Sequence, residues 1–207
     1  MGSLANSGNP RLGFLGGTFD PLHLGHLKIA EIALKHASLD KLLFCPAHHA
    51  PLRTAPALFS PQDRLAMVQA VCQTRPSMEA YAAEINHGET RYTIETMQEV
   101  KSQFPDHDLF LILGADQFSR LPEWKNVQTL ADLVHFLVFA RHAKCPSKPD
   151  IDNLRATFMD NSLINISSTH IREHIRCNSL PESLLPPEVL RYIYQQELFP
   201  NKIKSSA

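Results

Sequence analysis

The sequence predicts an α/β fold in which helices cover both faces of a doubly wound, mostly parallel sheet. Strand-like and helix-like segments alternate almost from the start of the chain, as in βαβ units. Residues 109–113, which follow Asp108, form a continuous apolar run, which is expected of a strand buried on both faces. Glycines, histidines and hydroxyl residues follow several of the strand-like segments, where such sheets bind their ligands.

The first half of the chain supplies three of the expected strands. We expect strands at residues 12–15, 41–45 and 77–85, a loop at 47–59, and helices over 24–34, from 61 and from 93. Ser60 and Pro61 have the residue types of an N-cap and a first helical turn. The apolar stripe of that helix is expected to contain Leu65, Val68 and Cys72, with Met67 and Val71 beside it.

The second half continues the alternation. We expect strands at residues 108–113, 134–140 and 162–166, helices over 127–131, 167–177 and 187–198, and loops after 114 and over 141–150. Residues 11–200 are therefore expected to form a single domain, with 179–200 a helical extension packed on it. The polar residues 1–10 are expected to be a disordered leader.

Composition excludes several classes of protein. The 207 residues are 43% hydrophobic and 20% charged, with a net charge of −1, which does not favour general binding to nucleic acid or to a membrane surface. The apolar run 133–140 is far shorter than the ~20 residues of a membrane span. The four cysteines form no CxxC pair, which favours reduced thiols over a disulfide framework. We expect a cytoplasmic protein, and a homo-oligomer is compatible with the sequence.

The stretch 13–26, GFLGGTFDPLHLGH, organises the chain. It joins a strand to a helix through a glycine turn, and free N–H groups at a helix start favour an anion. His23 and His26 lie where this helix begins. The same residues are compatible with an ordinary turn or with a zinc site, although no third zinc ligand is evident.

This stretch resembles the signature of the nucleotidylyltransferase superfamily, with His23-Leu24-Gly25-His26 as its HxGH element. Residues 166–172, ISSTHIR, resemble the second signature of that superfamily, ISSTxIR. The resemblance implies a Rossmann-like nucleotidylyltransferase fold and an enzyme that joins a nucleoside triphosphate to a phosphate-bearing acceptor. It implies Mg²⁺ carried with ATP, no metal site built from the protein, and catalysis by positioning and charge neutralisation.

The resemblance also implies roles for single residues. His23, His26 and Arg172 would be catalytic. The ATP site would contain Gly16, Gly17, Thr18, Phe19, His23, His26, Gly114, Asp116, Ile166, Ser167, Ser168, Thr169 and Arg172. Alone, Asp116 is also compatible with a helix cap and Trp124 with a core anchor.

Within the superfamily, the chain most resembles the bacterial nicotinate-nucleotide adenylyltransferases. The likeness rests on the segments 46–53 (PAHHAPLR), 84–93 (EINHGETRYT) and 113–116 (LGAD) followed by Trp124. It implies ATP and nicotinate mononucleotide as substrates, and an acceptor site of Gly17, Arg53, Tyr92, Thr93 and Trp124. Two positions depart from the family: Arg53 replaces a usual lysine, and 86–91 differs from the Arg-x-Gly-Pro-Ser pattern. Two alternatives therefore stay open. The acceptor could be nicotinamide mononucleotide or another phosphate compound, or the protein could be a non-catalytic nucleotide sensor.

Overall fold

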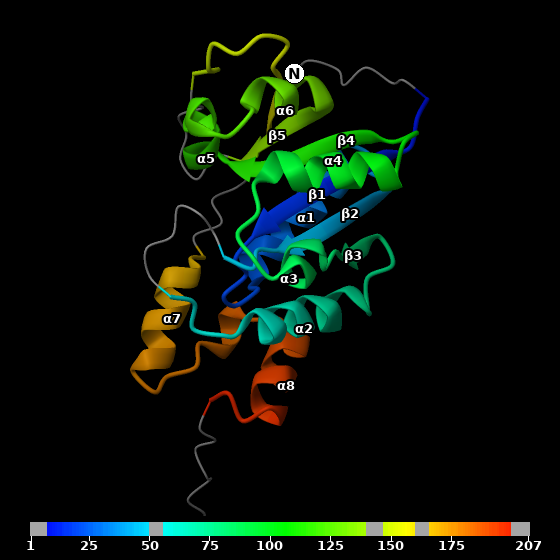
Figure 1. The fold of residues 1–207 in the computed structure, drawn as a ribbon. Coiled ribbons are helices and arrows are strands. Elements are labelled where there is room, and N and C mark those ends of the chain that lie inside the picture. Colours follow the sequence, from blue (N-terminus) through cyan, green and yellow to red (C-terminus); the bar gives the residue numbers. More distant parts are fainter. Residues whose placement is uncertain (1–7, 50–55, 140–146, 160–165, 200–207) are drawn as a thin grey trace, which may run out of the picture.

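Six parallel strands form one sheet with the order β3-β2-β1-β4-β5-β6 (Figure 1). The computed structural model describes residues 8–49, 56–139, 147–159 and 166–199. The strands are β1 (Arg11–Gly17), β2 (Lys41–Pro46), β3 (Met78–Ala80), β4 (Asp108–Gly114), β5 (Val134–Phe139) and β6 (Arg155–Met159). Every neighbouring pair is parallel, which confirms the predicted fold class and puts the carboxyl ends of all strands at one edge.

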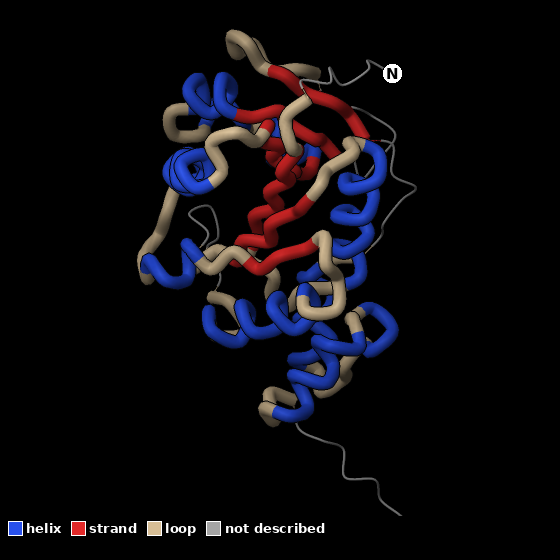
Figure 2. Tube along the Cα trace, turned by 90° about the vertical axis from the view of Figure 1, so that its right-hand side faces the viewer, coloured by secondary structure: helices blue, strands red, loops and turns tan. Residues whose placement is uncertain are grey.

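Two apolar cores fill the two faces of the sheet, because successive side chains of a strand point to opposite sides. Leu15, Leu42 and Phe44 belong to one core, whereas Phe14 and Leu43 belong to the other. The first core is covered by α1 (Leu24–His36), α2 (Pro61–Cys72), α7 (Ser168–Arg176) and α8 (Pro187–Gln195). The second is covered by α4 (Thr93–Gln103), α5 (Ala115–Ser119) and α6 (Val127–Leu133). Figure 2 shows helices on both sides of the sheet.

The stripe of α2 that faces the core differs from the expected one by one position. The buried residues are Arg64, Met67, Val68 and Val71, whereas Leu65 and Cys72 are only half-buried. Ser60 does cap the helix, since its hydroxyl accepts from the amide of Asp63 at 3.1 Å. Because the buried stripe is shifted by one residue from the expected one, it contains Arg64.

The strand expected at 77–85 is too long. β3 ends at Ala80, and the short helix α3 (Ala83–His87) follows. Ala82-Ala83-Glu84 is a run of good helix formers, and its propensity decides the local structure once pairing with β2 ends at Tyr81. Likewise, α5 and the 3₁₀ turn Leu121–Glu123 occupy part of the stretch expected to be a loop after residue 114.

The last strand of the sheet also differs from the expectation. Of the predicted strand 162–166, residues 162–165 lie outside the described residues, and Ile166 is not in a strand. β6 lies earlier, at Arg155–Met159, and its half-exposed residues gave no apolar run to recognise. Most of the expected loop 141–150, the leader residues 1–7 and residue 200 are outside the described residues as well.

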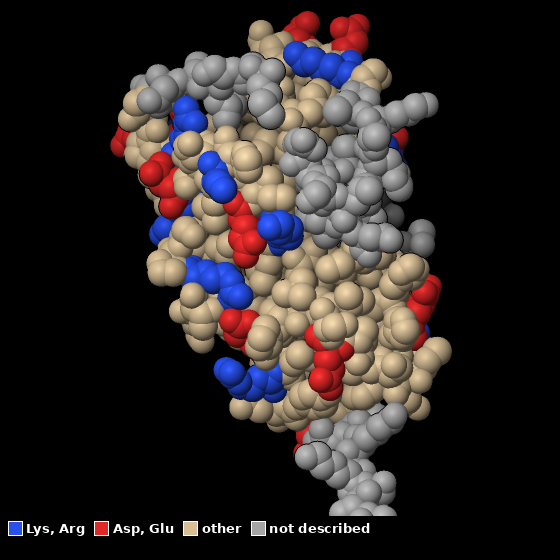
Figure 3. Space-filling view, turned by 180° about the vertical axis from the view of Figure 1, so that it is seen from behind, with Lys and Arg blue, Asp and Glu red and all other residues tan. Residues whose placement is uncertain are grey.

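Helix α8 packs on α2 through the buried Val189 and Ile193. Polar contacts fix the two helices: the hydroxyl of Tyr192 donates to Asp63 at 2.9 Å, and Arg75 pairs with Glu188 at 2.9 Å. Within the described residues, no helix is both long and apolar enough to cross a membrane. On the face shown in Figure 3, basic and acidic side chains are interspersed and do not form a patch of one sign.

Candidate active site

The candidate site lies where the direction of the strand order changes. β1 pairs with β2 on one side and with β4 on the other, so Gly17 and Gly114 end neighbouring strands at the same edge. In a doubly wound sheet, the crevice at this switch point is where ligands bind. The first signature therefore follows one central strand, and the predicted ATP residues Gly114 and Asp116 lie at the end of the other.

The turn after β1 is held tightly around Phe19. This residue has a φ of +47° and a buried ring that packs edge-on against His26 at 5.0 Å between centroids. A Cβ added at Gly17 would lie 3.2 Å from that ring, which is closer than ordinary side-chain contacts allow. Glycine at position 17 thus leaves room for the Phe19 ring against the end of β1.

The two histidines of the HxGH element stack at the start of α1. Their ring centroids are 3.7 Å apart with an interplanar angle of 20°, and His23 occupies the N-cap position. The amide of His23 donates to Nδ1 of His26 at 3.3 Å. Because Nδ1 accepts this hydrogen bond, a neutral His26 ring carries its proton on Nε2 and presents it as a donor.

Asp20 connects this turn to the second signature. Its side chain is buried, and the main-chain oxygen of Asp20 accepts from Nη1 of Arg172 at 3.1 Å. Nε of Arg172 lies 3.9 Å from the Asp20 carboxylate, and Nη2 donates to the hydroxyl of Thr169 at 3.0 Å. The contacts of Arg172 therefore bring the first turn of α7 against the turn after β1.

The start of α7 has the geometry of a capped helix. The hydroxyl of Ser167 accepts from the amide of Thr169 at 3.2 Å, while Ile166, Ser167 and Ser168 are half-buried. Thr169 is exposed. The first N–H groups of a helix have no partner within the helix. Those of α7 lie near the turn after β1, because Arg172 of α7 contacts Asp20 in that turn.

Gly114 ends β4 and precedes α5. A Cβ at this position would lie 2.5 Å from Oδ1 of Asp116, so glycine lets the Asp116 side chain fold back over the strand end. Asp116 is exposed in the first turn of α5. Among the described residues it makes no hydrogen bond to the HxGH element or to Arg172.

The predicted acceptor residues form a second group. Tyr92 is the N-cap of α4, the residue is 44% exposed, and Nζ of Lys125 lies 4.2 Å from the ring centroid. Lys125 also pairs with Glu95 at 2.7 Å. These contacts bring the start of α4, with Tyr92 and Thr93, next to the segment that carries Trp124. The half-buried indole packs against the second core, and Arg53 lies outside the described residues.

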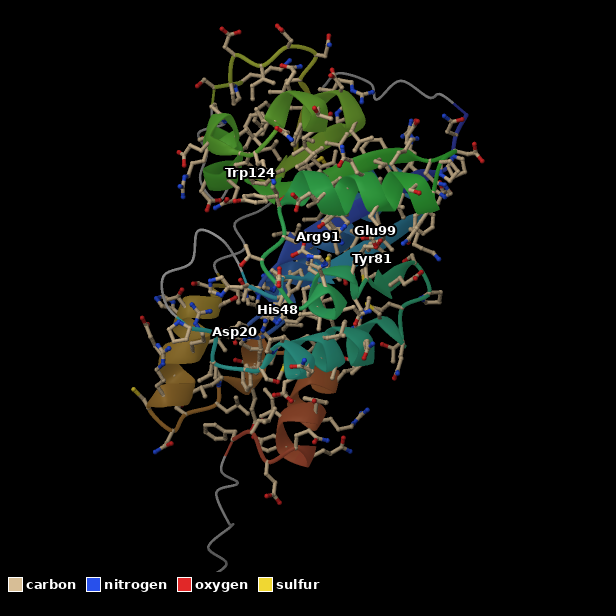
Figure 4. The ribbon with its side chains drawn as sticks, viewed as in Figure 1. Asp20, His48, Tyr81, Arg91, Glu99 and Trp124 are labelled. Atoms are coloured by element: carbon tan, nitrogen blue, oxygen red, sulfur yellow. The ribbon has the colours of Figure 1, made fainter. Side chains whose placement is uncertain are left out.

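Tyr81, Arg91 and Glu99 form a polar cluster beside the start of α4 (Figure 4). Glu99 accepts from the hydroxyl of Tyr81 at 2.8 Å and pairs with Arg91 at 2.5 Å. The hydrogen bond from Arg91, together with that from Tyr81, lowers the pKa of Glu99. Arg91 immediately precedes Tyr92, so this cluster fixes the entry to the predicted acceptor segment.

A more deeply buried carboxyl lies beside this cluster. Glu84 is 9% exposed and accepts from the hydroxyl of Thr96 at 3.0 Å. Burial raises the pKa of Glu84, and the hydrogen bond from Thr96 opposes that rise. Burial also raises the pKa of the Cys45 thiol, next to Glu84, which makes this cysteine a poor nucleophile.

Sequence reasoning missed several residues of this region. Tyr81 and Glu99 lie outside the recognised segments, and no role was predicted for Arg91 or Lys125. Only the packing of α4 brings these side chains together. Arg64 left a recognisable signal, because it shares the spacing of Met67, Val68 and Val71 on the buried face of α2. In the parts of the chain that the structure describes, no three His, Cys, Asp or Glu side chains gather in a way that could hold a metal ion.

Comparison with known proteins places this geometry in a family. Residues 14–174 match the family model described as cytidylyltransferase-like. The chain is 36% identical over 190 residues to a protein of Opitutus terrae and 35% identical over 216 residues to one of Desulfatibacillum aliphaticivorans, both named "probable nicotinate-nucleotide adenylyltransferase". The matches cover 91% of this chain in both cases, and 97% and 99% of those proteins.

A solved structure supports the fold. The Plasmodium falciparum nicotinic acid mononucleotide adenylyltransferase complexed with NaAD matches with a TM-score of 0.74 and 15% identity, over 91% of this chain and 97% of that one. At this identity the match bears on the fold alone. The parallel sheet, the paired signatures at its edge and the relatives along nearly the whole chain lead to one conclusion: the chain belongs to the cytidylyltransferase-like family and, within it, to the nicotinate-nucleotide adenylyltransferases.

Proposed function

We propose that the protein transfers the adenylyl group of ATP to nicotinate mononucleotide, with deamido-NAD and pyrophosphate as products. A phosphate oxygen of the acceptor attacks the α-phosphorus of ATP, and the bond from that phosphorus to the bridging oxygen of the β-phosphate breaks. The acceptor phosphate is already anionic at neutral pH, so the attack needs no enzyme base. The observation that carries the proposal is the turn after β1, which carries the stacked imidazoles and is contacted by Arg172 through Asp20, in a chain of this family.

The ATP half is proposed to surround the turn after β1. His23 and His26 donate hydrogen bonds to phosphate oxygens, and Arg172 supplies a planar, permanently charged fork beside them. Gly16 to Phe19 and Ile166 to Thr169 contribute main-chain amides and hydroxyls, while Gly114 and Asp116 hold the nucleoside. Mg²⁺ enters with the triphosphate, because this ion is usually held by substrate phosphates and water rather than by a protein cage.

The acceptor half is proposed to lie between α4 and the Trp124 segment. Main-chain amides near Thr93 bind the pyridine carboxylate, and Gly17, Arg53 and Tyr92 complete the site. The indole of Trp124 stacks on the pyridine ring, an arrangement worth roughly 0.5–1.5 kcal/mol beyond burial. Substrates of this kind fit a cytoplasmic enzyme.

The direct test is an assay of the wild-type protein with ATP, Mg²⁺ and either nicotinate mononucleotide or nicotinamide mononucleotide. We expect dinucleotide and pyrophosphate to form in equal amounts, with a higher kcat/KM for the nicotinate acceptor. Equal kcat/KM values would contradict the acceptor preference. ATP binding without turnover on either acceptor would identify a nucleotide sensor instead.

Two variants test the assignment of the halves. His26→Ala should abolish turnover with the fold intact, whereas His36→Ala, at the exposed end of the same helix, should leave turnover unchanged. Trp124→Ala should raise the KM for the acceptor and leave the KM for ATP nearly unchanged. Normal turnover of His26→Ala would refute the triphosphate assignment, and an unchanged acceptor KM would place the indole in the core only.

A further inference from the structure

Arg64 is a buried cation beneath the candidate site. It lies in the first turn of α2, is 1% exposed, and shares its face of the helix with Met67 and Val68. Placing a guanidinium in such surroundings is costly unless its N–H groups are hydrogen-bonded. The partners of Arg64 should therefore be part of what the fold requires.

In the part of the chain that the structure describes, the guanidinium donates to four main-chain carbonyls. Nη1 reaches the oxygens of Thr18 at 2.7 Å and Ala47 at 2.6 Å, Nη2 reaches His48 at 3.0 Å, and Nε reaches Phe59 at 3.4 Å. These carbonyls belong to three segments: the turn after β1, the turn after β2, and the residues that lead into α2. One side chain thus joins three segments at the carboxyl edge of the sheet.

Asp20 joins two of these segments, the turn after β1 and the residues that lead into α2. Its carboxylate accepts from the amide of Phe59 at 2.9 Å and from that of Leu58 at 2.9 and 3.1 Å. Phe59 is therefore bound through its N–H by Asp20 and through its carbonyl by Arg64. Because Arg172 contacts Asp20, a continuous path runs from α7 through residues 58–59 to Arg64 and the turns after β1 and β2. Figure 4 labels Asp20 and His48 along this path.

We propose that Arg64 is a positioning residue of the adenylyl transfer reaction. The inference rests on the function proposed above, in which the turn after β1 binds ATP and the turn after β2 leads to Arg53 on the acceptor side. By holding Thr18 and residues 47–48 at one guanidinium, Arg64 sets the distance between the two substrates. It acts through the main chain and does not touch them, because its side chain is buried.

The chemistry of arginine explains why this residue type is required. A guanidinium offers five N–H donors in a rigid plane, so it can serve carbonyls from different segments at fixed angles. A lysine ammonium keeps the charge but offers a compact head that cannot reach all four oxygens. Arg64→Lys should therefore fold and leave the two turns less well aligned. Misplacement by about 1 Å can cost on the order of 100-fold in rate.

The test is a comparison of steady-state kinetics and ATP binding for the wild type, Arg64→Lys and Arg64→Met. We expect kcat to fall about 10- to 100-fold in Arg64→Lys, with a higher KM for both substrates and a weaker Kd for ATP. Arg75→Met is the matched control: Arg75, just beyond the other end of α2, also binds a carbonyl and pairs with Glu188, far from the turns. It should lower stability and leave the kinetics of the folded enzyme unchanged.

A double-mutant cycle with Asp20→Asn tests the path itself. Because both side chains fix Phe59, the losses in kcat/KM from Arg64→Lys and Asp20→Asn should be less than additive. Wild-type kcat, KM and ATP Kd in folded Arg64→Lys, equal losses in Arg75→Met, or strict additivity would overturn the inference. If the wild type binds ATP but does not turn over, the proposed function fails, while the ATP Kd of Arg64→Lys still decides the role of Arg64.

Discussion

Two arginines lie beside the two proposed halves of the site and are held by different kinds of partner. Arg64, on the face of the first core, is satisfied by main-chain carbonyls from three segments. Arg91, on the face of the second core, pairs with the carboxylate of Glu99 and donates to the carbonyl of Glu95 at 3.3 Å. The first arginine organises loops, whereas the second joins the start of α4 to a side chain of the same helix.

The two arginines differ in whether their partners can be protonated. Main-chain carbonyls have no pKa in the accessible range, so the hydrogen bonds of Arg64 persist at any pH at which the protein folds. The Arg91 pair depends on the ionisation of Glu99, whose side chain is 34% exposed. The two arginines also differ in burial, since Arg64 is 1% exposed and the side chain of Arg91 is 16% exposed. Loss of a hydrogen bond costs more in the interior, where water cannot replace the lost partner.

The largest expected effect is on the stability of Arg64→Met. Removal of the guanidinium leaves four carbonyls of buried or half-buried residues without this donor and a cavity on the buried face of α2, and we expect a loss of about 2–4 kcal/mol in the free energy of unfolding. Urea denaturation measures it. The loss should be constant between about pH 5 and 8, since neither arginine nor carbonyls titrate there. A loss no larger than that of the exposed Arg120→Met would contradict the role of these hydrogen bonds.

Arg91→Met should cost less and should depend on pH. A partly exposed pair of this kind contributes about 0.5–1 kcal/mol at neutral pH. Because Arg91 lowers the pKa of Glu99 in the folded state below the ordinary 4.5, the contribution is present above that value. It is lost as the pH falls through the folded-state pKa. Denaturation of both proteins from acid to neutral pH measures the difference, and a flat profile would show that the pair is not what Arg91 contributes.

The same variant should affect only one substrate. Arg91 precedes the proposed acceptor segment, so Arg91→Met should raise the KM for nicotinate mononucleotide about threefold, roughly 0.6 kcal/mol, with the KM for ATP unchanged. Tyr81→Phe, which removes a neutral donor to the same Glu99, is the control and should change the KM for nicotinate mononucleotide less than Arg91→Met does. A parallel rise in the KM for ATP would mean that the two arginines are not separate supports.

The smallest expected effect has the opposite sign. Burial raises the pKa of Glu84, so the folded state binds a proton more tightly than the unfolded state does. Stability therefore falls as the pH rises above the ordinary value of 4.5, and Glu84→Gln should gain stability at neutral pH, by less than Arg91→Met loses. The amide oxygen can still accept from Thr96. Thermal unfolding of the two proteins at neutral and acidic pH checks the sign, and a loss at neutral pH would contradict it.

Much of the fold followed from local patterns. The strands that became β1, β2, β4 and β5 are short apolar runs, and burial on both faces makes such runs recognisable. β6 was missed because it is half-exposed, and α3 because helix propensity ended a strand that alternation alone would have continued. In α2, an error of one residue in the stripe hid Arg64, since 100° of rotation is enough to exchange an interior for a half-exposed position.

The sequence by itself determined the two signatures and their local form: the glycine turn and histidines after β1 and the hydroxyl cap of α7 are short-range features whose geometry follows from a few neighbouring residues. Only the tertiary structure decided what holds these parts together. Asp20 meets Arg172, which is 152 positions away, and Arg64 meets Thr18, which is 46 positions away. Such contacts depend on how helices pack over the sheet edge, and no local pattern encodes which distant carbonyl a buried guanidinium will find.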